Sequence, residues 1–453
     1  MSNNWHNFLG SILIICSVNI AAWGQVDNVT LSTKVNSPLS RFGIGDPVQQ
    51  YFNHSAAMGG LSAGWQDPYR LNLQNPASLA SLRWTAFEGG IYAKKSTYTS
   101  AEAKDQTWGG NLQYLALGFP LRNALNQALD RESNEWNAGM SFALVPYSQV
   151  GYDIQLIDVQ TPGVQQSTNT LKGAGGLTRF RWGTGFRYKQ LSVGLDAGFV
   201  FGKIINSRLV VFDSLLAAFD TEFRDDLSIK TTIWTAGAQY AFEFKHLDKK
   251  GNSVPSGKRV LLGATLTNEA SFKSTGTQFI RRLLSSVSDT VVFDDAIKGT
   301  GVLPASFSVG IHYQDINKLN IGIEYGASTW SNYKNSLKQE NEPLKDTYYI
   351  AIGGEYIPKH NSYNRYWERI RYRAGFRYAT DPRSLNGTQV EDYSFSLGFG
   401  LPVIMPRQQI SFVSTSIEFG KTGVAGVLEE NYVRLNFGFT LNDNSWFFKR
   451  KFN

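Results

Sequence analysis

Cysteine and histidine are nearly missing from this sequence. The chain has one cysteine, Cys16, in an apolar run near the N-terminus, and five histidines in all. A single thiol cannot form an intrachain disulfide or a multi-thiolate metal centre. The histidines do not recur at the spacing of metal ligands. The sequence therefore predicts no metal, no cofactor and no disulfide framework.

Long apolar runs are missing as well, except at the N-terminus. Residues 8–24 read FLGSILIICSVNIAAWG and end in small residues before Gln25, which is the layout of a secretory signal peptide, although residues 1–7 contain no Lys or Arg. Beyond residue 24 no stretch of 18 apolar residues occurs, so no transmembrane helix is expected. We interpret residues 1–24 as a signal peptide that directs export.

Charge is sparse, whereas aromatic residues and glycine are common. Charged residues make up 18% of the chain and aromatic residues 13%, there are 43 glycines, and the formal net charge is +7. An exported chain of this composition without membrane helices favours a transmembrane β-barrel in a Gram-negative outer membrane. Its expected partners are outer-membrane lipid and lipopolysaccharide, and no nucleic acid. Lys and Arg, including those of 365–373, are expected to face phosphates or water.

Strict alternation of residue type marks the strands. In residues 191–202, LSVGLDAGFVFG, one face is apolar and the other is mostly Gly, Ser and Asp; residues 319–326, 393–400 and 433–441 follow the same rule. Such alternation places one face in an apolar medium and the other in a polar one. In lipid every backbone amide needs a partner, which a closed barrel supplies. The small, polar face suits a lumen that holds a plug or water.

The sequence offers fifteen strand segments, and bacterial barrels have an even number. Joining two of them into one kinked strand, 135–159, gives fourteen and makes short and long connections alternate. Pro146 lacks a backbone donor and Gly151 tolerates a bend, so the kink is placed between them. The longer connections, which we predict to be external loops, include 205–227, 271–304 and 331–345.

The stretch 25–83 does not read as strand. It is rich in Ser, Gly, Asn and Pro, and its leucines weigh against a disordered tail. We predict a hatch, a plug inside the lumen on the periplasmic side. The expected organisation is a signal peptide at 1–24, a hatch at 25–83, a fourteen-stranded antiparallel barrel at 84–441 and a short periplasmic extension at 442–453.

The order of motifs in this stretch resembles the FadL/TodX family of outer-membrane transport proteins. In that family an N-terminal hatch carries small residues, an Asp and an Asn-Pro-Ala motif before the first strand; here the small residues are 57–60, followed by Asp67 and by Asn75, Pro76 and Ala77. The opening SPLSRFGIGD at 37–46 and LVPYSQVGYDI at 144–154 are similar to segments of a large, mostly uncharacterised Gram-negative subgroup of this family.

The resemblance implies a fourteen-stranded barrel plugged by the hatch. In family members that carry hydrophobic compounds, the ligand binds among the external loops and leaves sideways through a gap at a kink in the third strand. The third strand corresponds to 135–159, so Pro146, Tyr147 and Gly151 are the candidate lateral opening. Asn75-Pro76-Ala77 is then either a hinge or seal of the hatch, or an ordinary turn that anchors it.

The connection 205–227 is unusually apolar for an external loop, and exposed apolar patches usually mark binding. It could form a groove for a hydrophobic ligand, dock a partner protein, or cap the barrel, and 271–304 shares these alternatives. Its candidate residues are Leu209, Val211, Phe212, Leu215 and Phe219.

One pattern suggests catalysis but lacks its context. Residues 60–64 read GLSAG, which matches the G-x-S-x-G nucleophile elbow. That elbow requires a preceding buried strand, a following helix, and Asp and His partners. We interpret the segment as small-residue packing and expect no enzyme.

Two functions remain open on these grounds. The first is passive transport of hydrophobic small molecules, similar to fatty acids, across the outer membrane. The second is a non-transporting barrel subunit of a larger outer-membrane complex for protein secretion or barrel assembly. A continuous apolar path from the loops to the kink would favour transport, whereas a filled lumen would favour the subunit.

Overall fold

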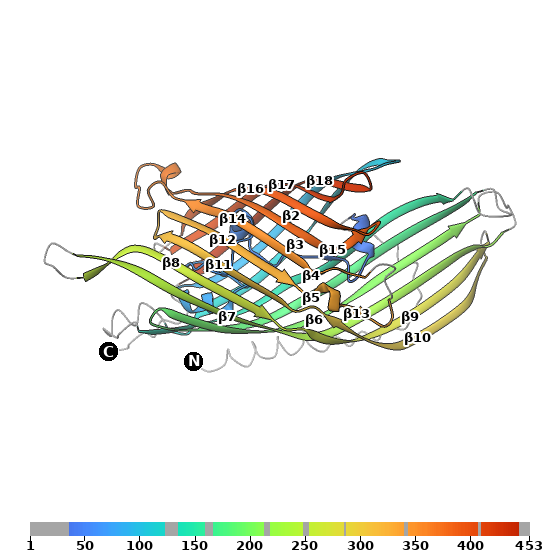
Figure 1. Ribbon diagram of the computed structural model, residues 1–453, viewed down its shortest axis with the longest axis horizontal. Helices are drawn as coiled ribbons and strands as arrows, with labels where there is room; N and C mark the ends of the chain where they lie inside the picture. The colour runs from blue at the N-terminus through green and yellow to red at the C-terminus, as the bar shows by residue number, and fades with distance from the viewer. Residues whose placement is uncertain are drawn as a thin grey trace, which may run out of the picture. The chain divides into compact units, whose positions relative to one another are not determined.

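The computed structural model describes residues 36–122, 135–158, 166–212, 218–247, 253–284, 287–338, 343–405 and 409–443, which leaves the predicted signal peptide outside the described residues. An antiparallel sheet closes into a fourteen-stranded barrel because its last strand pairs with its first (Figure 1). The strands are β2 (Thr85–Ser100), β3 (Lys104–Pro120), β4 (Trp136–Asp158), β5 (Ser167–Tyr188), β6 (Leu191–Val211), β7 (Asp220–Leu247), β8 (Ser253–Thr267), β9 (Ala270–Leu284), β10 (Val287–Leu303), β11 (Ser306–Asp315), β12 (Leu319–Ser328), β14 (Thr347–Tyr356), β15 (Arg371–Leu385), β16 (Thr388–Met405), β17 (Gln409–Val424) and β18 (Leu428–Asp443).

These strands occupy fourteen positions around the barrel, because β8 and β9 share one position and β10 and β11 share the next. β8 and β9 both pair with β7, and β10 and β11 run back along them. The prediction of an external loop at 271–304 was therefore wrong, because this segment is a long β-hairpin. Its alternation is blurred by polar residues on both faces, as expected where the strands leave the apolar layer.

The connection 205–227 was also predicted too long. β6 continues to Val211 and β7 begins at Asp220. Together with β4, β5, β9 and β10, these strands form a wall that extends beyond the other strands at the end of the barrel where β4 ends and β5 begins (Figure 1). Because both chain ends are predicted to be periplasmic, we assign this wall to the external side.

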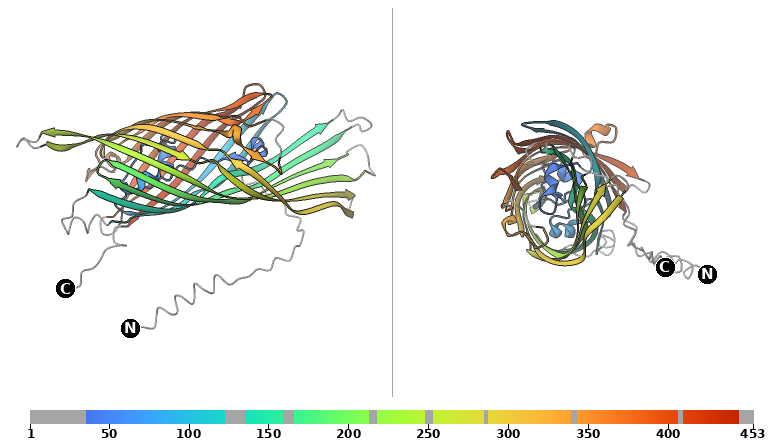
Figure 2. Two further views of the ribbon diagram at one scale, coloured as in Figure 1. Left: turned by 60° about the horizontal axis from the view of Figure 1, so that its bottom comes forward. Right: turned by 90° about the vertical axis from the view of Figure 1, so that its right-hand side faces the viewer.

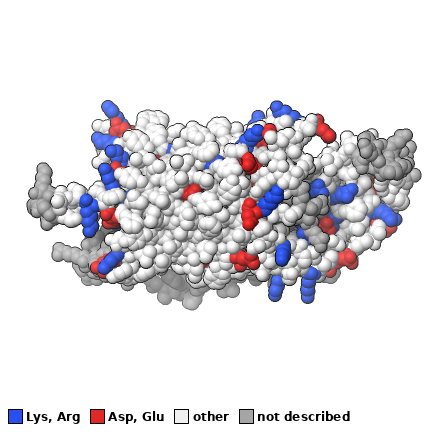
Figure 3. Space-filling model, viewed as in Figure 1, with Lys and Arg blue, Asp and Glu red and all other residues white. Residues whose placement is uncertain are grey.

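The barrel has an apolar outside and a polar inside. Side chains such as Phe199, Trp234 and Ile311 are exposed on the outer face, while Gln239 and His312 are buried in the lumen. Figure 3 shows a wide band nearly free of charge between charged ends. A closed barrel with such a belt suits a lipid bilayer, so the chain is an outer-membrane protein. Among the described residues, no helix has the length and hydropathy needed to cross a membrane.

The N-terminal segment lies inside the lumen (Figure 2, right). It contains the short elements η1 (Pro38–Arg41), β1 (Asp46–Pro47), α2 (Asn53–Ala56) and η2 (Pro76–Ser81). Nearly all of its side chains from Tyr51 to Leu82 are buried. We call residues 36–83 the hatch.

Glycines in the wall create the space for the hatch. A Cβ added to Gly263 would lie 1.9 Å from the carbonyl oxygen of Ala63, and one on Gly194 would lie 2.4 Å from the backbone nitrogen of Ala77. The glycine-rich inner face therefore reflects close backbone approach between wall and hatch.

Candidate functional site

The seam between β3 and β4 is open over much of its length. The two strands pair from Leu115–Leu144 to Pro120–Gly139, at the C-terminal end of β3. Beyond that point β3 pairs with β2 alone, and β4 continues beside β5. Residues 104–114 of β3 and 145–158 of β4 therefore present sheet edges toward each other without a direct ladder.

A bulge in β4 marks the point where the seam opens. The register between β4 and β5 shifts between Pro146 and Ser148. Pro146 has no N–H to donate to a ladder, which explains why regular pairing fails there. The predicted kink at Pro146 thus coincides with an irregularity of the wall.

The hatch pairs with the exposed edge of β4. β1 is antiparallel to β4, with Asp46 opposite Gln149 and Pro47 opposite Ser148. The N–H of Val48 donates to the carbonyl oxygen of Tyr147 at 3.0 Å. Further out, the N–H of Ser37 donates to the carbonyl oxygen of Gly151 at 2.7 Å. Hatch backbone here takes the place that the neighbouring strand would fill in a regular barrel.

Asn36 contacts both sides of the seam. Its carbonyl oxygen accepts hydrogen bonds from the hydroxyl groups of Tyr98 (2.9 Å) on β2 and Thr107 (3.3 Å) on β3. Its side-chain oxygen accepts from the N–H of Asp153 on β4 at 3.3 Å. The hatch segment from residue 36 to residue 48 therefore closes the seam. Besides these hydrogen bonds, Asp46 forms an ion pair with Arg383 of β15, and Ile44 packs against wall residues.

The Asn75-Pro76-Ala77 motif begins the 3-10 helix η2. Asn75 is the N-cap, and its side-chain oxygen accepts from the N–H of Ala77 at 3.1 Å. Its amide nitrogen donates to the carbonyl oxygen of Ala63 at 2.6 Å and approaches those of Ala238 and Ala264 on β7 and β8 at 3.3 and 3.4 Å. The motif therefore caps a turn and contacts the wall with the same side chain.

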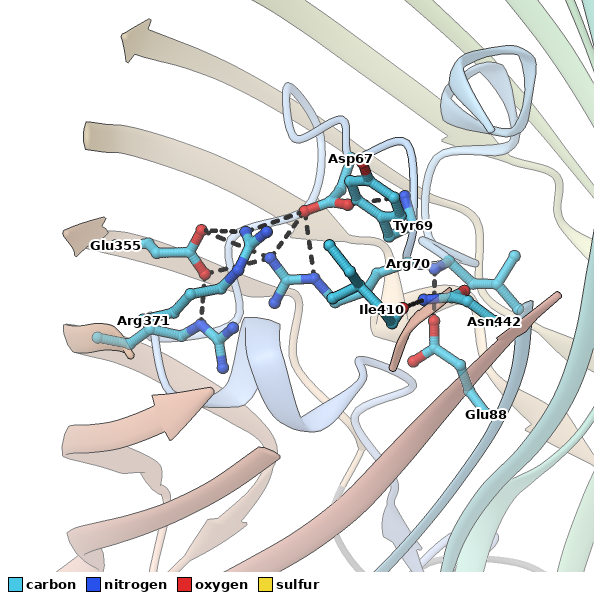
Figure 4. Close-up of polar contacts among 10 residues, drawn as sticks. Asp67, Tyr69, Arg70, Glu88, Glu355, Arg371, Ile410 and Asn442 are labelled. Carbon is cyan, nitrogen blue, oxygen red and sulfur yellow. Dashed lines mark hydrogen bonds and ion pairs between the residues drawn. The ribbon is translucent and has the colours of Figure 1, made fainter. Parts of the chain in front are cut away.

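Asp67 lies in a buried network of opposite charges (Figure 4). Its carboxylate accepts from Arg70 at 2.7 Å, and Arg371 lies 3.4 Å away. Glu355 on β14 binds Arg371 at 2.9 Å, Arg373 at 2.7 Å and Arg70 at 3.2 Å. Burial alone would raise the pKa of Asp67, but Arg70 and Arg371 outweigh burial and lower that pKa below its ordinary value.

Sequence reasoning found Asp67 but missed its partners. The basic residues of 365–373 were expected to face phosphates or water, whereas Arg373 is buried in the lumen and Arg371 is largely buried. Alternation along the strand is the sequence signal that could have identified them. Arg371, Arg373 and Arg377 occupy every second position, on the face opposite to outward aromatic residues such as Phe376.

His54 makes the hatch sensitive to acid. Its ring stacks on Trp65, with centroids 4.3 Å apart, and burial lowers the pKa of His54 well below its ordinary value. A displaced hatch would bind a proton below about pH 6.5, whereas the docked hatch would not. We expect the contribution of His54 to docking to weaken by about 1.4 kcal/mol for each pH unit below this value.

Hydrogen exchange at hatch amides, corrected for the intrinsic pH dependence, measures this effect. A His54→Phe variant keeps an aromatic ring on Trp65 and should lose the pH dependence between pH 6.5 and 5. Asp67 has a lowered pKa, so its contribution is lost only at still lower pH. An unchanged slope in His54→Phe would assign the effect to another group.

Two polar cavities remain in the lumen. They measure about 260 and 220 Å³ and share lining residues that include Pro47, Trp330 and Arg377. Arg179 and Arg181 line the first, and Glu418 and Arg434 line the second. Tyr147, at the predicted kink of β4, also lines the first cavity, which is therefore bounded by arginines on one side and by the kink on another.

An apolar cluster fills the lumen beside these cavities. Ile44 of the hatch packs there with wall residues, and Trp330 and Leu344 come from the connection between β12 and β14. Lys338 of the same connection donates to the carbonyl oxygens of Arg41 (2.6 Å) and Gly43 (2.9 Å). The external connection therefore holds the hatch from the outside.

The apolar residues assigned to the 205–227 loop lie at the tip of the wall. Leu209 and Val211 belong to β6, Phe212 follows it, and Phe219 is exposed before β7. Leu215 lies outside the described residues.

The GLSAG segment packs against a wall carboxylate. Glu324 on β12 accepts from the N–H groups of Ser62 and Ala63, both at 2.7 Å, and the Ser62 hydroxyl donates to Gln74 at 2.7 Å. Among the described residues, no group of three or more His, Cys, Asp and Glu side chains could hold a metal ion.

This architecture, a closed fourteen-stranded barrel with its N-terminal segment in the lumen, matches solved hydrocarbon channels. The Pseudomonas putida toluene transporter TodX superposes with a TM-score of 0.55 at 16% identity, covering 89% of this chain and all of that one. The CymD monoaromatic hydrocarbon channel gives 0.52 at 14%, with coverages of 89% and 99%. The Ralstonia pickettii toluene transporter TbuX gives 0.51 at 13%, with coverages of 87% and 99%.

The chain thus has the fold of the FadL/TodX channels, as its sequence motifs predicted. Its own family is a different one: the model of the BamG family matches residues 11–453, and the chain belongs to that family. No curated protein sequence matches it significantly.

Proposed function

We propose that this protein is a passive outer-membrane channel for hydrophobic small molecules, with the β3–β4 seam as its lateral port. The observation that carries the proposal is that the wall is closed at this seam by hatch residues 36–48 instead of by its own strands. Hydrogen bonds, the ion pair between Asp46 and Arg383 and the packing of Ile44 hold this short segment to the wall. Displacing it would open the wall without breaking the barrel.

The outer rim of the seam suits an apolar ligand. Trp108, Leu112 and Leu115 on β3 and Leu144 on β4 are exposed on the outer face. A molecule that leaves through this rim enters the bilayer core directly, which is favourable for an apolar compound. The solved channels of this fold carry toluene and other monoaromatic hydrocarbons, which supports the same ligand class here.

A reversible cross-link tests the port. Pro47→Cys with Ser148→Cys joins facing residues of β1 and β4, and the only native cysteine, Cys16, lies in the predicted signal peptide. We expect oxidation to abolish uptake of toluene and of a long-chain fatty acid by intact cells, and reductant to restore it.

The matched control places the disulfide within a closed seam. Ser416→Cys with Asn436→Cys joins facing residues of β17 and β18, which are already paired along their length. Oxidation of this pair should leave uptake unchanged. Full uptake through the oxidised 47–148 pair would show that the seam is not the port.

A second function is favoured by different observations. The lumen is filled by the hatch and an apolar cluster, and the chain belongs to the BamG family. Both fit a barrel that serves as a subunit of a larger outer-membrane complex. Native mass spectrometry after mild extraction from its own membrane distinguishes the two: a lone barrel with a bound apolar ligand supports transport, and stoichiometric partner proteins support the subunit.

A further inference from the structure

Strands β6, β7, β9 and β10 belong to the wall that extends on the external side. Their lipid-facing surface carries lysines just beyond the exposed aromatic residues. On β6 the outward residues change from Phe199 and Phe201 to Lys203, and on β7 from Trp234 to Lys230. Lys273 on β9 and Lys298 on β10 continue this row, and all four lysines are exposed. Figure 3 shows Lys and Arg, interspersed with Asp and Glu, over the region where β6, β9 and β10 are labelled in Figure 1.

Strand register brings these lysines together. Lys230 and Lys273 are direct Cα partners on β7 and β9. Lys298 is opposite Thr275, and Lys203 is opposite Ser228, each one step further along the same face. Facing side chains on paired strands have Cβ atoms about 5 Å apart, and diagonal neighbours are within reach of long side chains.

Three of the four lysines have no carboxylate to balance them. Lys203 pairs with Asp226 at 2.8 Å, and Asp226 also binds Arg224 at 3.0 Å. No ion pair joins Lys230, Lys273 or Lys298 to any carboxylate in the described part of the chain. Like charges that face each other across strands destabilise a sheet, so an anion between Lys230 and Lys273 would relieve this repulsion.

We propose that Lys230, Lys273 and Lys298 bind the phosphate of a phosphorylated outer-leaflet lipid. The location selects a lipid, because these side chains lie where the apolar belt ends and a headgroup begins. Acyl chains of the same molecule would contact Phe199 and Phe201 below the lysines. The hydroxyl groups of Ser228 and Thr275, on the same face, supply further donors to the phosphate. This site is independent of the β3–β4 seam and of the proposed transport.

Lipid binding to the full chain tests the site. The protein in neutral phosphatidylcholine nanodiscs is titrated with monophosphoryl lipid A, and bound lipid is counted by native mass spectrometry. The variant combines Lys230→Gln, Lys273→Gln and Lys298→Gln. Each surface lysine near an anionic headgroup contributes several-fold to affinity, so the triple change should weaken binding by about 100-fold.

The control removes the same charge at the opposite end of the barrel. Lys245→Gln, Lys258→Gln and Lys318→Gln are exposed lysines near the periplasmic turns. This variant should bind lipid A as the unchanged protein does. Both variants are checked for folding by the gel shift of a heat-sensitive barrel.

Three outcomes would overturn the proposal. The first is equal lipid binding by the wall variant and the unchanged protein, and the second is equal loss in both variants. In the third, inorganic phosphate alone displaces the lipid at similar concentration, which would reveal a free-anion site. Specific binding that is lost in the wall variant alone supports the proposal.

Discussion

A Glu355→Gln variant is expected to release the hatch at neutral pH while leaving the barrel folded. Glu355 contacts Arg70 of the hatch together with Arg371 and Arg373 of β15. Glutamine keeps the size of the side chain but removes its charge. Arg70 and Arg371 would then be left with Asp67, and the buried Arg373 would lose the carboxylate that it pairs with. Removing one partner of a buried ion pair costs about 3–5 kcal/mol.

Hydrogen exchange separates the hatch from the wall in this experiment. Amides of residues 57–82 should exchange faster by two orders of magnitude or more, while those of β6 and β17 keep their protection. Glu429→Gln is the matched control, because Glu429 pairs with the half-exposed Lys421 on the external side and such pairs contribute little. If hatch amides in Glu355→Gln exchange as slowly as in the control, the network does not hold the hatch.

The strands and the hatch were predictable because their causes are local in sequence. A barrel strand alternates because one face meets lipid. The even strand count and the alternation of short and long connections placed the kink at Pro146, where a donor is missing. Asn75 likewise acts within its own turn, as an N-cap to Ala77. The local structure at each of these residues can be predicted from its neighbours along the chain.

The closure of the seam was not predictable for the opposite reason. Ser40 and Gly151 exchange hydrogen bonds across 111 residues of sequence, and nothing local to Ser40 selects that partner. The strands of the 271–304 hairpin were not recognised in the sequence for a related reason. In water both faces of a strand can be polar, so the alternation of apolar and polar residues is lost. Local patterns identify strands in lipid better than strands that extend beyond it.

A Gly263→Ala variant should displace the hatch by steric exclusion, the second large effect that the structure predicts. The added Cβ would lie 1.9 Å from the carbonyl oxygen of Ala63 and 2.6 Å from the backbone nitrogen of Gly64. These are backbone atoms of the hatch that cannot rotate away, and the adjacent turn is fixed by Glu324 and Asn75. Overpacking of this kind costs about 1–3 kcal/mol and occasionally more, and here the contact with backbone atoms favours the upper end.

Gly276→Ala separates this effect from a general loss of glycine in the wall. Gly276 also faces the lumen, from β9, but the nearest atom to an added Cβ is the side-chain Cδ1 of Leu337 at 3.0 Å, which can move. Protease cleavage within residues 57–82 should therefore be fast in Gly263→Ala and slow in Gly276→Ala, with both barrels intact on gels. Equal protection of the hatch in the two variants would mean that the wall yields at Gly263. The glycine-rich lumen would then reflect the flexibility of the strands and not the close fit of the hatch, and opening of the seam would require movement of the wall as well.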